Sequence, residues 1–243
     1  MYALYLKEIR GFLNSVVGYV FLLVFLTACW LFNWMLDSSM NLISYGQADL
    51  TPFFSAAPYV LLILIPAITM KSLADERRTG TIELLYTRPL SDLSILMAKY
   101  LAGVSLMLLA ILPTLVFYGT LYYLGNPVGN IDSGAVFTSY IGLLLLGAAF
   151  VAIGIFSSSI TTSQIVSFII AIALCYFFYD GLSLLGNYTQ FGNLDFYLQY
   201  ISLNFHYDAI KKGVVDARDI VFNFSFIVLF LSASLYLVKT FKK

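Results

Sequence analysis

Charged side chains gather in one stretch of the sequence, residues 71–99, which lies between two long apolar runs. Its charges are mixed in sign and comprise the bases Lys71, Arg77, Arg78, Arg88 and Lys99 and the acids Asp75, Glu76, Glu83 and Asp92. Such side chains form ion pairs and contact the charged surface of a partner. The whole sequence contains no phosphate loop of the form GxxxxGK[ST], so we expect no nucleotide hydrolysis by this chain alone.

Other residue types that could do chemistry are isolated. Cys29 and Cys175 lie in apolar runs without a CxxC pattern, which predicts buried free thiols. The single histidine, His206, has no second metal ligand nearby in sequence, so we expect an ordinary surface role for it. Asp180 lies in an apolar run without a histidine or lysine to pair with. We therefore expect no catalytic residues, no metal site and no cofactor in this chain, and neither an intramembrane hydrolase nor an ion-coupled carrier.

Composition places the chain in a membrane. Hydrophobic residues make up 60% of its 243 residues and charged residues 11%, and the mean hydropathy is +0.89. Soluble domains carry roughly a quarter of their residues as charges. A hydrocarbon layer of ~30 Å takes about 20 helical residues to cross. Long unbroken apolar runs satisfy their backbone groups there as helices, so the sequence predicts an all-α integral membrane protein.

Six apolar runs are long enough to cross the bilayer, and they define one transmembrane domain over residues 1–243. The predicted crossings are 16–36, 53–70, 99–124, 135–156, 164–185 and 220–238. Residues 26–29 resemble the cleavage box of a bacterial lipoprotein, but the apolar run continues beyond them, so we expect a retained helix. Pro58 and Pro66 should kink the second crossing or relieve its backbone pairing.

The fourth crossing carries small residues that would let another helix approach closely: Gly147, Ala148, Ala152, Gly154 and Ser158. They form one candidate packing face for a second membrane subunit, and the kinked second and third crossings offer others. A Ser/Thr turn over residues 157–163 is expected to join the fourth crossing to the fifth.

Two further segments show helical periodicity. Residues 1–15 predict an amphipathic interface helix with Lys7, Glu8 and Arg10 on its polar face, and a plain positively charged leader is the alternative. In the outer segment 186–219, apolar residues recur at helical spacing, at Leu194, Tyr197, Leu198, Ile201 and Phe205. This spacing predicts one amphipathic helix at the membrane surface that stops near Gly213.

The distribution of basic residues predicts the orientation, because loops rich in Lys and Arg stay in the cytoplasm. With six crossings, ten of the 13 Lys and Arg residues share a side with both termini and segment 71–98, and Lys211, Lys212 and Arg218 lie opposite. We therefore expect both termini and segment 71–98 to be cytoplasmic.

Within segment 71–98, the order of residues predicts a bent pair of helices. Asp75–Arg78 should continue the second crossing, and Gly80 should break it. Thr81–Leu85 can then form a short cross-helix, with Glu83 near its positive end. Held at both ends by transmembrane helices, such a cross-helix would act as a lever. A solvated charged loop that merely fixes topology is the alternative.

The string DERRTGTIELL (75–85), followed by RPLS (88–91), resembles the link between the second and third helices of the ABC-2-type permease family. The two strings ERRTGTIELLYTRPLS (76–91) and KGVVDARDI (212–220) are most similar to permease subunits associated with bacterial gliding motility. Near the surface helix this chain reads Ser-Leu-Asn (202–204) where the family usually has Ser-Pro.

The resemblance implies a membrane subunit of an ATP-driven exporter in the cytoplasmic (inner) membrane of a bacterium. It implies a separate ATPase that binds ATP and Mg, and a second membrane subunit, either a copy of this chain or a related permease. It also assigns contact with the ATPase to Asp75, Glu76, Arg77, Arg78, Thr79, Gly80, Thr81, Glu83, Leu84, Leu85, Arg88 and Pro89. A non-transporting scaffold or sensor subunit of a larger complex is the alternative. The sequence does not identify the transported substance.

Overall fold

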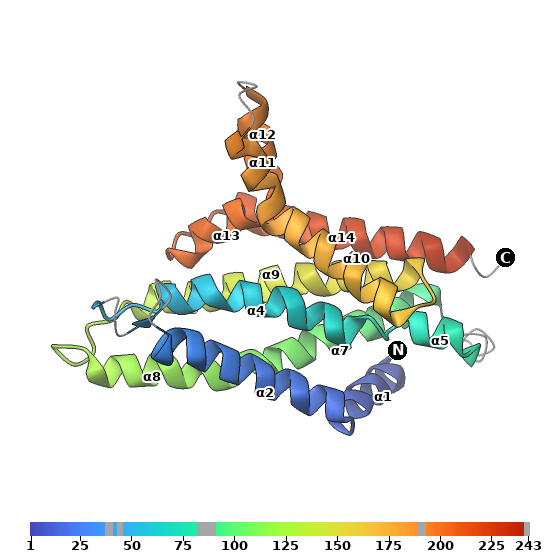
Figure 1. Ribbon diagram of the computed structural model, residues 1–243, viewed down its shortest axis with the longest axis horizontal. Coiled ribbons are helices and arrows are strands. Elements are labelled where there is room, and N and C mark those ends of the chain that lie inside the picture. The colour runs from blue at the N-terminus through green and yellow to red at the C-terminus, as the bar shows by residue number, and fades with distance from the viewer. Residues whose placement is uncertain (37–40, 43–45, 82–90, 189–192, 241–243) are drawn as a thin grey trace.

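The computed structural model describes residues 1–36, 41–42, 46–81, 91–188 and 193–240 (Figure 1). Every regular element in these ranges is a helix. In chain order they are α1 (Tyr2–Leu13), α2 (Val16–Trp30), η1 (Leu31–Met35), α4 (Thr51–Thr69), α5 (Ala74–Arg78), α7 (Asp92–Ile111), η2 (Leu112–Thr114), α8 (Leu115–Leu124), α9 (Ser133–Ile160), α10 (Gln164–Tyr176), η3 (Phe177–Gly181), α11 (Leu182–Tyr188), α12 (Asn193–Ile201), α13 (Leu203–Lys211) and α14 (Ala217–Thr240).

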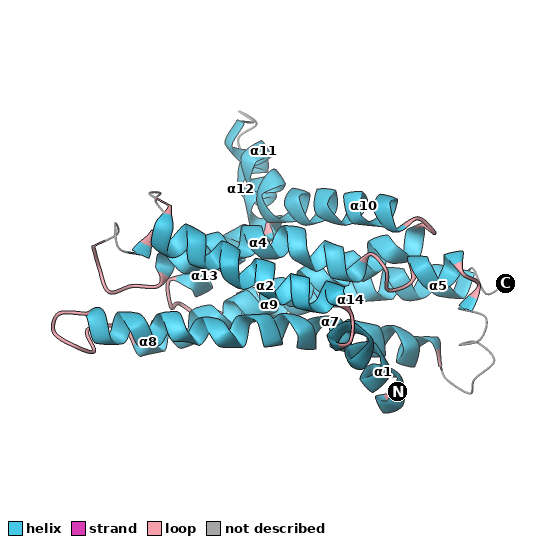
Figure 2. Ribbon diagram, turned by 60° about the horizontal axis from the view of Figure 1, so that its bottom comes forward, coloured by secondary structure: helices cyan, strands magenta, loops and turns pink. Residues whose placement is uncertain are grey.

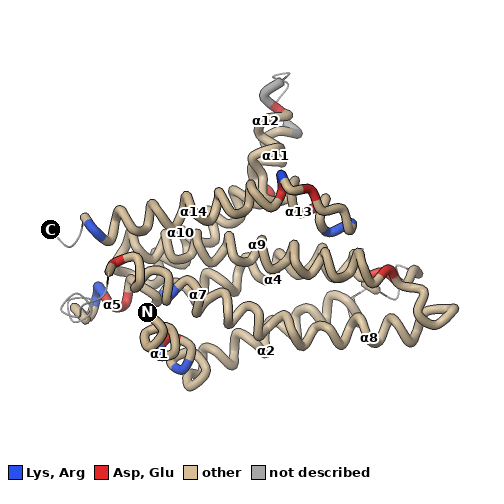
Figure 3. Tube along the Cα trace, turned by 180° about the vertical axis from the view of Figure 1, so that it is seen from behind, with Lys and Arg blue, Asp and Glu red and all other residues tan. Residues whose placement is uncertain are grey.

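Six helical spans in the described ranges are long and apolar enough to cross a membrane, which confirms the predicted fold class. They are Val16–Met35, Thr51–Arg78, Asp92–Leu124, Ser133–Ile160, Gln164–Gly186 and Ala217–Thr240. The long helices run roughly side by side, and the two ends of the chain lie at the same end of the bundle as α5 (Figure 1). Charged residues gather at the two ends of the bundle and are sparse between them (Figure 3).

The centre of the bundle is α9. In its most apolar window 72% of the residues are buried, against 28% in α2, α10 and α14, and it packs against α4, α7, α10, α13 and α14. Its small residues make these contacts possible: a Cβ at Gly147 would collide with Met107 of α7, and one at Gly154 with Thr69 of α4. The predicted small-residue face is therefore covered within this chain, and its interpretation as a face for a second subunit was wrong.

Prolines and serines are accommodated inside the helices. α4 remains helical through Pro58 and Pro66, whereas the span of α7 and α8 passes through the 3-10 turn η2 at Pro113. α9 extends to Ile160, so the turn predicted over residues 157–163 begins later. The Ser157 hydroxyl donates to the carbonyl of Ile153 at 3.0 Å, a bond within the helix that lets serine occupy its last turns.

The N-terminal helix is shorter than predicted and is docked on the bundle. α1 buries Leu4 against Ile95 and Ala98 of α7, and the Tyr5 hydroxyl lies 2.8 Å from that of Ser105. Sequence periodicity predicted an amphipathic helix here, but it did not predict the contact of Leu4 with α7.

The predicted outer surface helix is instead two helices. α12 ends at Ile201 and α13 begins at Leu203, because the Ser202 hydroxyl accepts a hydrogen bond from the Asn204 amide at 3.2 Å and starts a new helix. α11 and α12 form a hairpin that projects away from the bundle (Figures 1 and 2). α13 ends at Lys211, and Gly213 follows with φ +82°, as the sequence predicted.

Candidate functional site

The polar segment after α4 is joined to it by a turn. α4 ends at Thr69, and after the turn α5 carries the second crossing on to Arg78, so the continuation that we expected is present but is interrupted by the turn. The hydroxyl of Ser158 in α9 accepts hydrogen bonds from the amides of Leu73 and Ala74, both at 2.9 Å. It also donates to the carbonyl of Met70 at 3.2 Å. A side chain from another membrane helix thus supplies the missing cap of α5.

Two further contacts join α5 to the α9–α10 turn. The Arg77 guanidinium donates to the carbonyl of Ser159 at 2.6 Å. The Asp75 carboxylate accepts from the Gln164 amide at 2.6 Å and from Arg78 at 2.9 Å. Hydrogen bonds to charged groups are the stronger kind in proteins. α5 is therefore attached to the hairpin of α9 and α10.

On its other side, α5 is attached through a buried lysine. Lys99 of α7 is only 4% exposed. Its ammonium lies 2.7 Å from the Glu76 carboxylate, 3.3 Å from that of Glu8 in α1, and 2.8 Å from the carbonyl of Ser72, to which it donates. All three N–H bonds of the ammonium can thus be used. The Lys99 cluster (Glu8, Ser72, Glu76 and Lys99) joins α1, α5 and α7 at one point.

The end of α5 and the described residues that follow it are exposed. Arg78, Thr79, Gly80 and Thr81 are exposed, and the hydroxyls of Thr79 and Thr81 lie 2.9 Å apart. Gly80 has φ +72°, a left-handed conformation that glycine adopts without strain and that ends α5. The prediction that the helix ends at Gly80 is therefore confirmed. Glu83, Leu84, Leu85, Arg88 and Pro89, and with them the cross-helix, lie outside the described residues.

The structure thus brings Glu76 together with Glu8 of the interface helix at Lys99, whereas Arg77 and Asp75 contact α9 and α10. Lys7 lines a neighbouring cleft, and Arg10 is exposed. The sequence did not predict that Ser158 and Gln164 form hydrogen bonds with α5 and the turn before it. It predicted Lys99 only as a charged residue at the start of a crossing. One signal was available: Lys99 stands between Ala98 and Tyr100 within an apolar helix, where an ionisable residue needs a partner.

The family of the chain follows from a comparison with protein-family models, in which the one described as ABC-2 family transporter protein matches residues 3–238. The chain belongs to the ABC-2 transporter family. A search of the curated proteins found no match. This ABC-2 protein is therefore a multi-pass membrane permease subunit of an ABC transporter, a transport component whose family implies association with an ABC ATPase and a membrane partner.

At the far end of the ABC-2 bundle, His206 is buried and paired, so its predicted surface role was wrong. Its Nδ1 lies 2.7 Å from the Asp219 carboxylate, and its Nε2 lies 2.8 Å from the carbonyl of Tyr200. Because a carbonyl only accepts, Nε2 must carry a proton and donate. The ring also stacks on Phe222 at 4.0 Å between centroids. Asp219 stands 13 residues further along the chain, too far for local sequence patterns to pair the two.

The next residue, Tyr207, attaches α13 to α4. Burial, and secondarily the charge of Asp208, raise the pKa of the Tyr207 hydroxyl well above its usual value. The phenol therefore stays neutral and donates to the carbonyl of Phe54 at 2.7 Å. This contact fixes the position of α13 across the end of α4 and α9.

Asp180 lies in the π-helical turn η3 and has polar partners. Its carboxylate accepts from the Tyr59 hydroxyl at 2.8 Å and from the Asn204 amide at 2.7 Å. The missing basic partner is thus replaced by two neutral donors. Cys29 and Cys175 are buried free thiols, as predicted.

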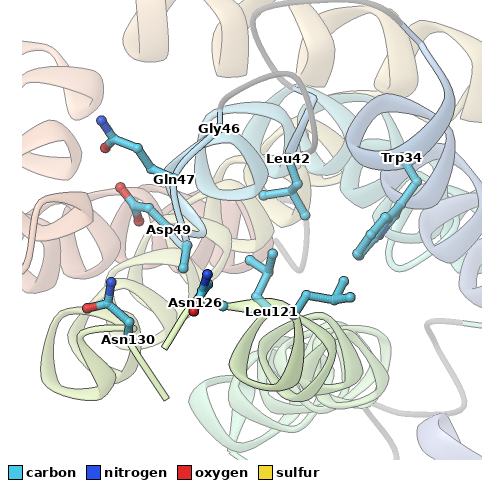
Figure 4. Close-up of a pocket in the computed structure, with 11 residues that line it drawn as sticks. Trp34, Leu42, Gly46, Gln47, Asp49, Leu121, Asn126 and Asn130 are labelled. Atoms are coloured by element: carbon cyan, nitrogen blue, oxygen red, sulfur yellow. The ribbon is translucent and has the colours of Figure 1, made fainter. Parts of the chain in front are cut away.

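A cavity of about 680 Å³ with a mixed polar and apolar lining lies at the same far end, between the end of α8 and the chain that precedes α4 (Figure 4). Gln47, Asp49, Asn126 and Asn130 contribute polar groups to its lining, and Trp34 and Leu121 contribute apolar ones. It lies at the opposite end of the bundle from the Lys99 cluster.

Proposed function

We propose that this permease subunit couples ATP hydrolysis by a separate ATPase to transport across the inner membrane of a bacterium, with α5 and the segment that follows it as the contact. The observation that carries the proposal is the attachment of α5 to four other helices. Ser158 and Arg77 join it to α9, Gln164 joins it to α10, and Lys99 joins it to α7 and α1.

The exposed side of α5 suits a protein partner. Arg78 carries a side chain that is 62% exposed, and Thr79, Gly80 and Thr81 extend the same open surface. An ATPase that pushed on this surface would move α5 and the α4–α5 turn together. The turn would transmit the movement to α9, because buried hydrogen bonds join it to Ser158. The displacement would reach α9, the central helix, without a flexible linker between.

The rest of the proposal follows from the orientation. Both chain ends lie on the side of α5 (Figure 1), and the excess of basic residues on that side supports a cytoplasmic location. ATP and Mg then bind to the partner ATPase, and a second membrane subunit completes the exporter.

The resemblance of residues 76–91 and 212–220 to gliding-motility permeases favours gliding as the process that this subunit serves. Deletion of the gene in its host, followed by measurement of cell spreading, would test this.

Co-purification with the ATPase tests the coupling. We expect the chain to recover a P-loop ATPase and to change its turnover, and Arg78→Glu or Glu83→Lys to weaken both effects, since loss of a desolvated interface charge pair costs ~2 to 5 kcal/mol. Lys239→Glu is the matched control, because it reverses an exposed charge on α14. An ATPase that binds normally but never changes its turnover would favour the scaffold function instead.

A further inference from the structure

The imidazole ring of His206 lies between the ends of two other helices. The carbonyl of Tyr200 belongs to the last turn of α12, and the last carbonyls of a helix have no partner within it. Asp219 stands in the first turn of α14, where the helix dipole stabilises a carboxylate. Because His206 of α13 bonds to both groups, three helices meet at one ring.

The two contacts determine how many protons the ring carries. Nε2 must donate to the Tyr200 carbonyl, because a carbonyl only accepts. Nδ1 of a neutral ring would then present a lone pair to Asp219 at 2.7 Å, and a carboxylate presents only lone pairs as well. The contact therefore needs a second proton between the two atoms. Imidazole is a stronger base than a carboxylate, so this proton belongs to the ring, which is an imidazolium.

The surroundings favour a charged ring and keep water away from it. His206 is 1% exposed and Asp219 is 7% exposed. The ring stacks on Phe222, and the rings of Tyr200 and Phe205 meet it at 5.0 and 5.5 Å between centroids. The face of an aromatic ring attracts a cation. Exclusion of water strengthens the attraction of opposite charges, and it would equally strengthen the repulsion between the carboxylate and an unprotonated Nδ1.

The other ionisable side chains of α13 and of the elements packed against it do not bond to His206. These elements are α9, η3, α12 and α14. Asp180 of η3 accepts from Tyr59 and Asn204, and Asp208 of α13 pairs with Lys211. The remaining ionisable side chains of these elements and of the turn before α14 are Tyr140, Tyr179, Asp195, Tyr197, Tyr200, Tyr207, Lys212, Asp216, Arg218, Tyr236 and Lys239. Within the described part of the chain, none of these side chains forms a hydrogen bond or an ion pair with the ring.

We propose that Tyr200, His206 and Asp219 form a proton-dependent latch that holds α12 and α13 against the start of α14. The latch is closed while both ring nitrogens carry a proton. As the pH rises, Nδ1 gives its proton to water, which reaches the pair through the Asp219 side chain, 10% exposed. Nε2 can still donate to Tyr200, but Nδ1 and the carboxylate now repel each other. The ring then moves away from α14 together with α12 and α13, and the projecting α11–α12 hairpin is loosened from the bundle (Figure 2).

His206 is the only histidine of the sequence, which allows a direct test. The full chain, purified without a histidine tag, would be labelled with 15N-histidine in nanodiscs and its ring nitrogens followed by NMR from about pH 6 to about pH 9. Parallel samples would carry spin labels at Tyr197→Cys in α12 and Val221→Cys in α14, two exposed positions. The native cysteines are buried, so the labels attach to the introduced ones.

We expect the Nδ1 proton to be lost over the same pH range in which the distance between the labels increases. Loss of one proton changes the ratio of open to closed molecules by up to about tenfold per pH unit, so we expect a change of about tenfold or more over the whole range. A neutral ring with the labels still close would overturn the proposal. A ring that kept both protons throughout would also overturn it.

Asp219→Asn distinguishes the latch from a general loosening in alkali. The new side-chain amide can donate to Nδ1 of a neutral ring, so the contact no longer needs the second proton. We expect the labels to stay close, with less than about a twofold change in the ratio of open to closed molecules. Asp208→Asn is the matched control, because it removes a carboxylate of α13 that pairs with Lys211 and should open as the parent does. Opening of Asp219→Asn at the parental pH would assign the response to another group and overturn the latch.

Discussion

The Lys99 ammonium lies 2.7 Å from the Glu76 carboxylate, although 23 residues separate the two in the chain. The lysine side chain is only 2% exposed and the glutamate 16%. Because Glu8 of α1 contacts the same ammonium, one side chain holds three helices together.

Lys99→Met should destabilise the protein strongly. The change leaves the Glu8 and Glu76 carboxylates partly buried without their cation, and breaking a buried pair in this way costs ~3 to 5 kcal/mol. Thermal unfolding in detergent measures the effect. The triple change Lys99→Met, Glu8→Gln and Glu76→Gln should recover much of the loss, because no uncompensated charge remains. A single variant as stable as the parent would contradict the role of the cluster.

Ser158→Ala should loosen α5 without unfolding the bundle. It removes the acceptor of the Leu73 and Ala74 amides, and losing a capping side chain costs about 0.5 to 2 kcal/mol. Hydrogen exchange at these two amides should rise. Ser225→Ala is the matched control, because that hydroxyl donates to the carbonyl of Val221 within its own helix, α14. Equal protection in both variants would show that the cap adds nothing.

Gly80→Val should disturb the end of α5. A β-branched residue at φ +72° is strained by about 1 to 2 kcal/mol, although no atom lies within 4 Å of the added Cβ. We expect normal membrane insertion and reduced stimulation of the ATPase. Gly119→Val is the control, since it also has open space but lies within α8. Parental stimulation in Gly80→Val would favour the solvated-loop alternative.

His206 and Asp219 should be energetically coupled. Alanine at either position leaves the other buried polar group without its partner, so each single change should cost about 1 to 3 kcal/mol. The double change should cost less than the sum, a difference that a double-mutant cycle of thermal unfolding measures. Additive losses would mean that the 2.7 Å contact contributes nothing of its own.

Sequence alone determined the properties that depend on local composition and period. Apolar runs of bilayer length predicted the six crossings, because the cost of unpaired backbone groups in hydrocarbon leaves no other solution. The left-handed conformations at Gly80 and Gly213 could likewise be predicted, since they arise from the missing Cβ. The family could be recognised from the string at residues 75–91, which carries it in consecutive residues.

Only the tertiary structure decided which polar groups meet. Ser158 and Leu73 are 85 residues apart, and Lys99 and Glu8 are 91 residues apart. No local pattern pairs such residues, because the contact exists only once α9 and α1 have packed against their neighbours. The same reason explains the two errors. The small residues of α9 could have packed against a second subunit or against other helices of this chain. The burial of His206 depended on Asp219, near the start of another helix. The packing of the helices decided both the contacts of α9 and the burial of His206.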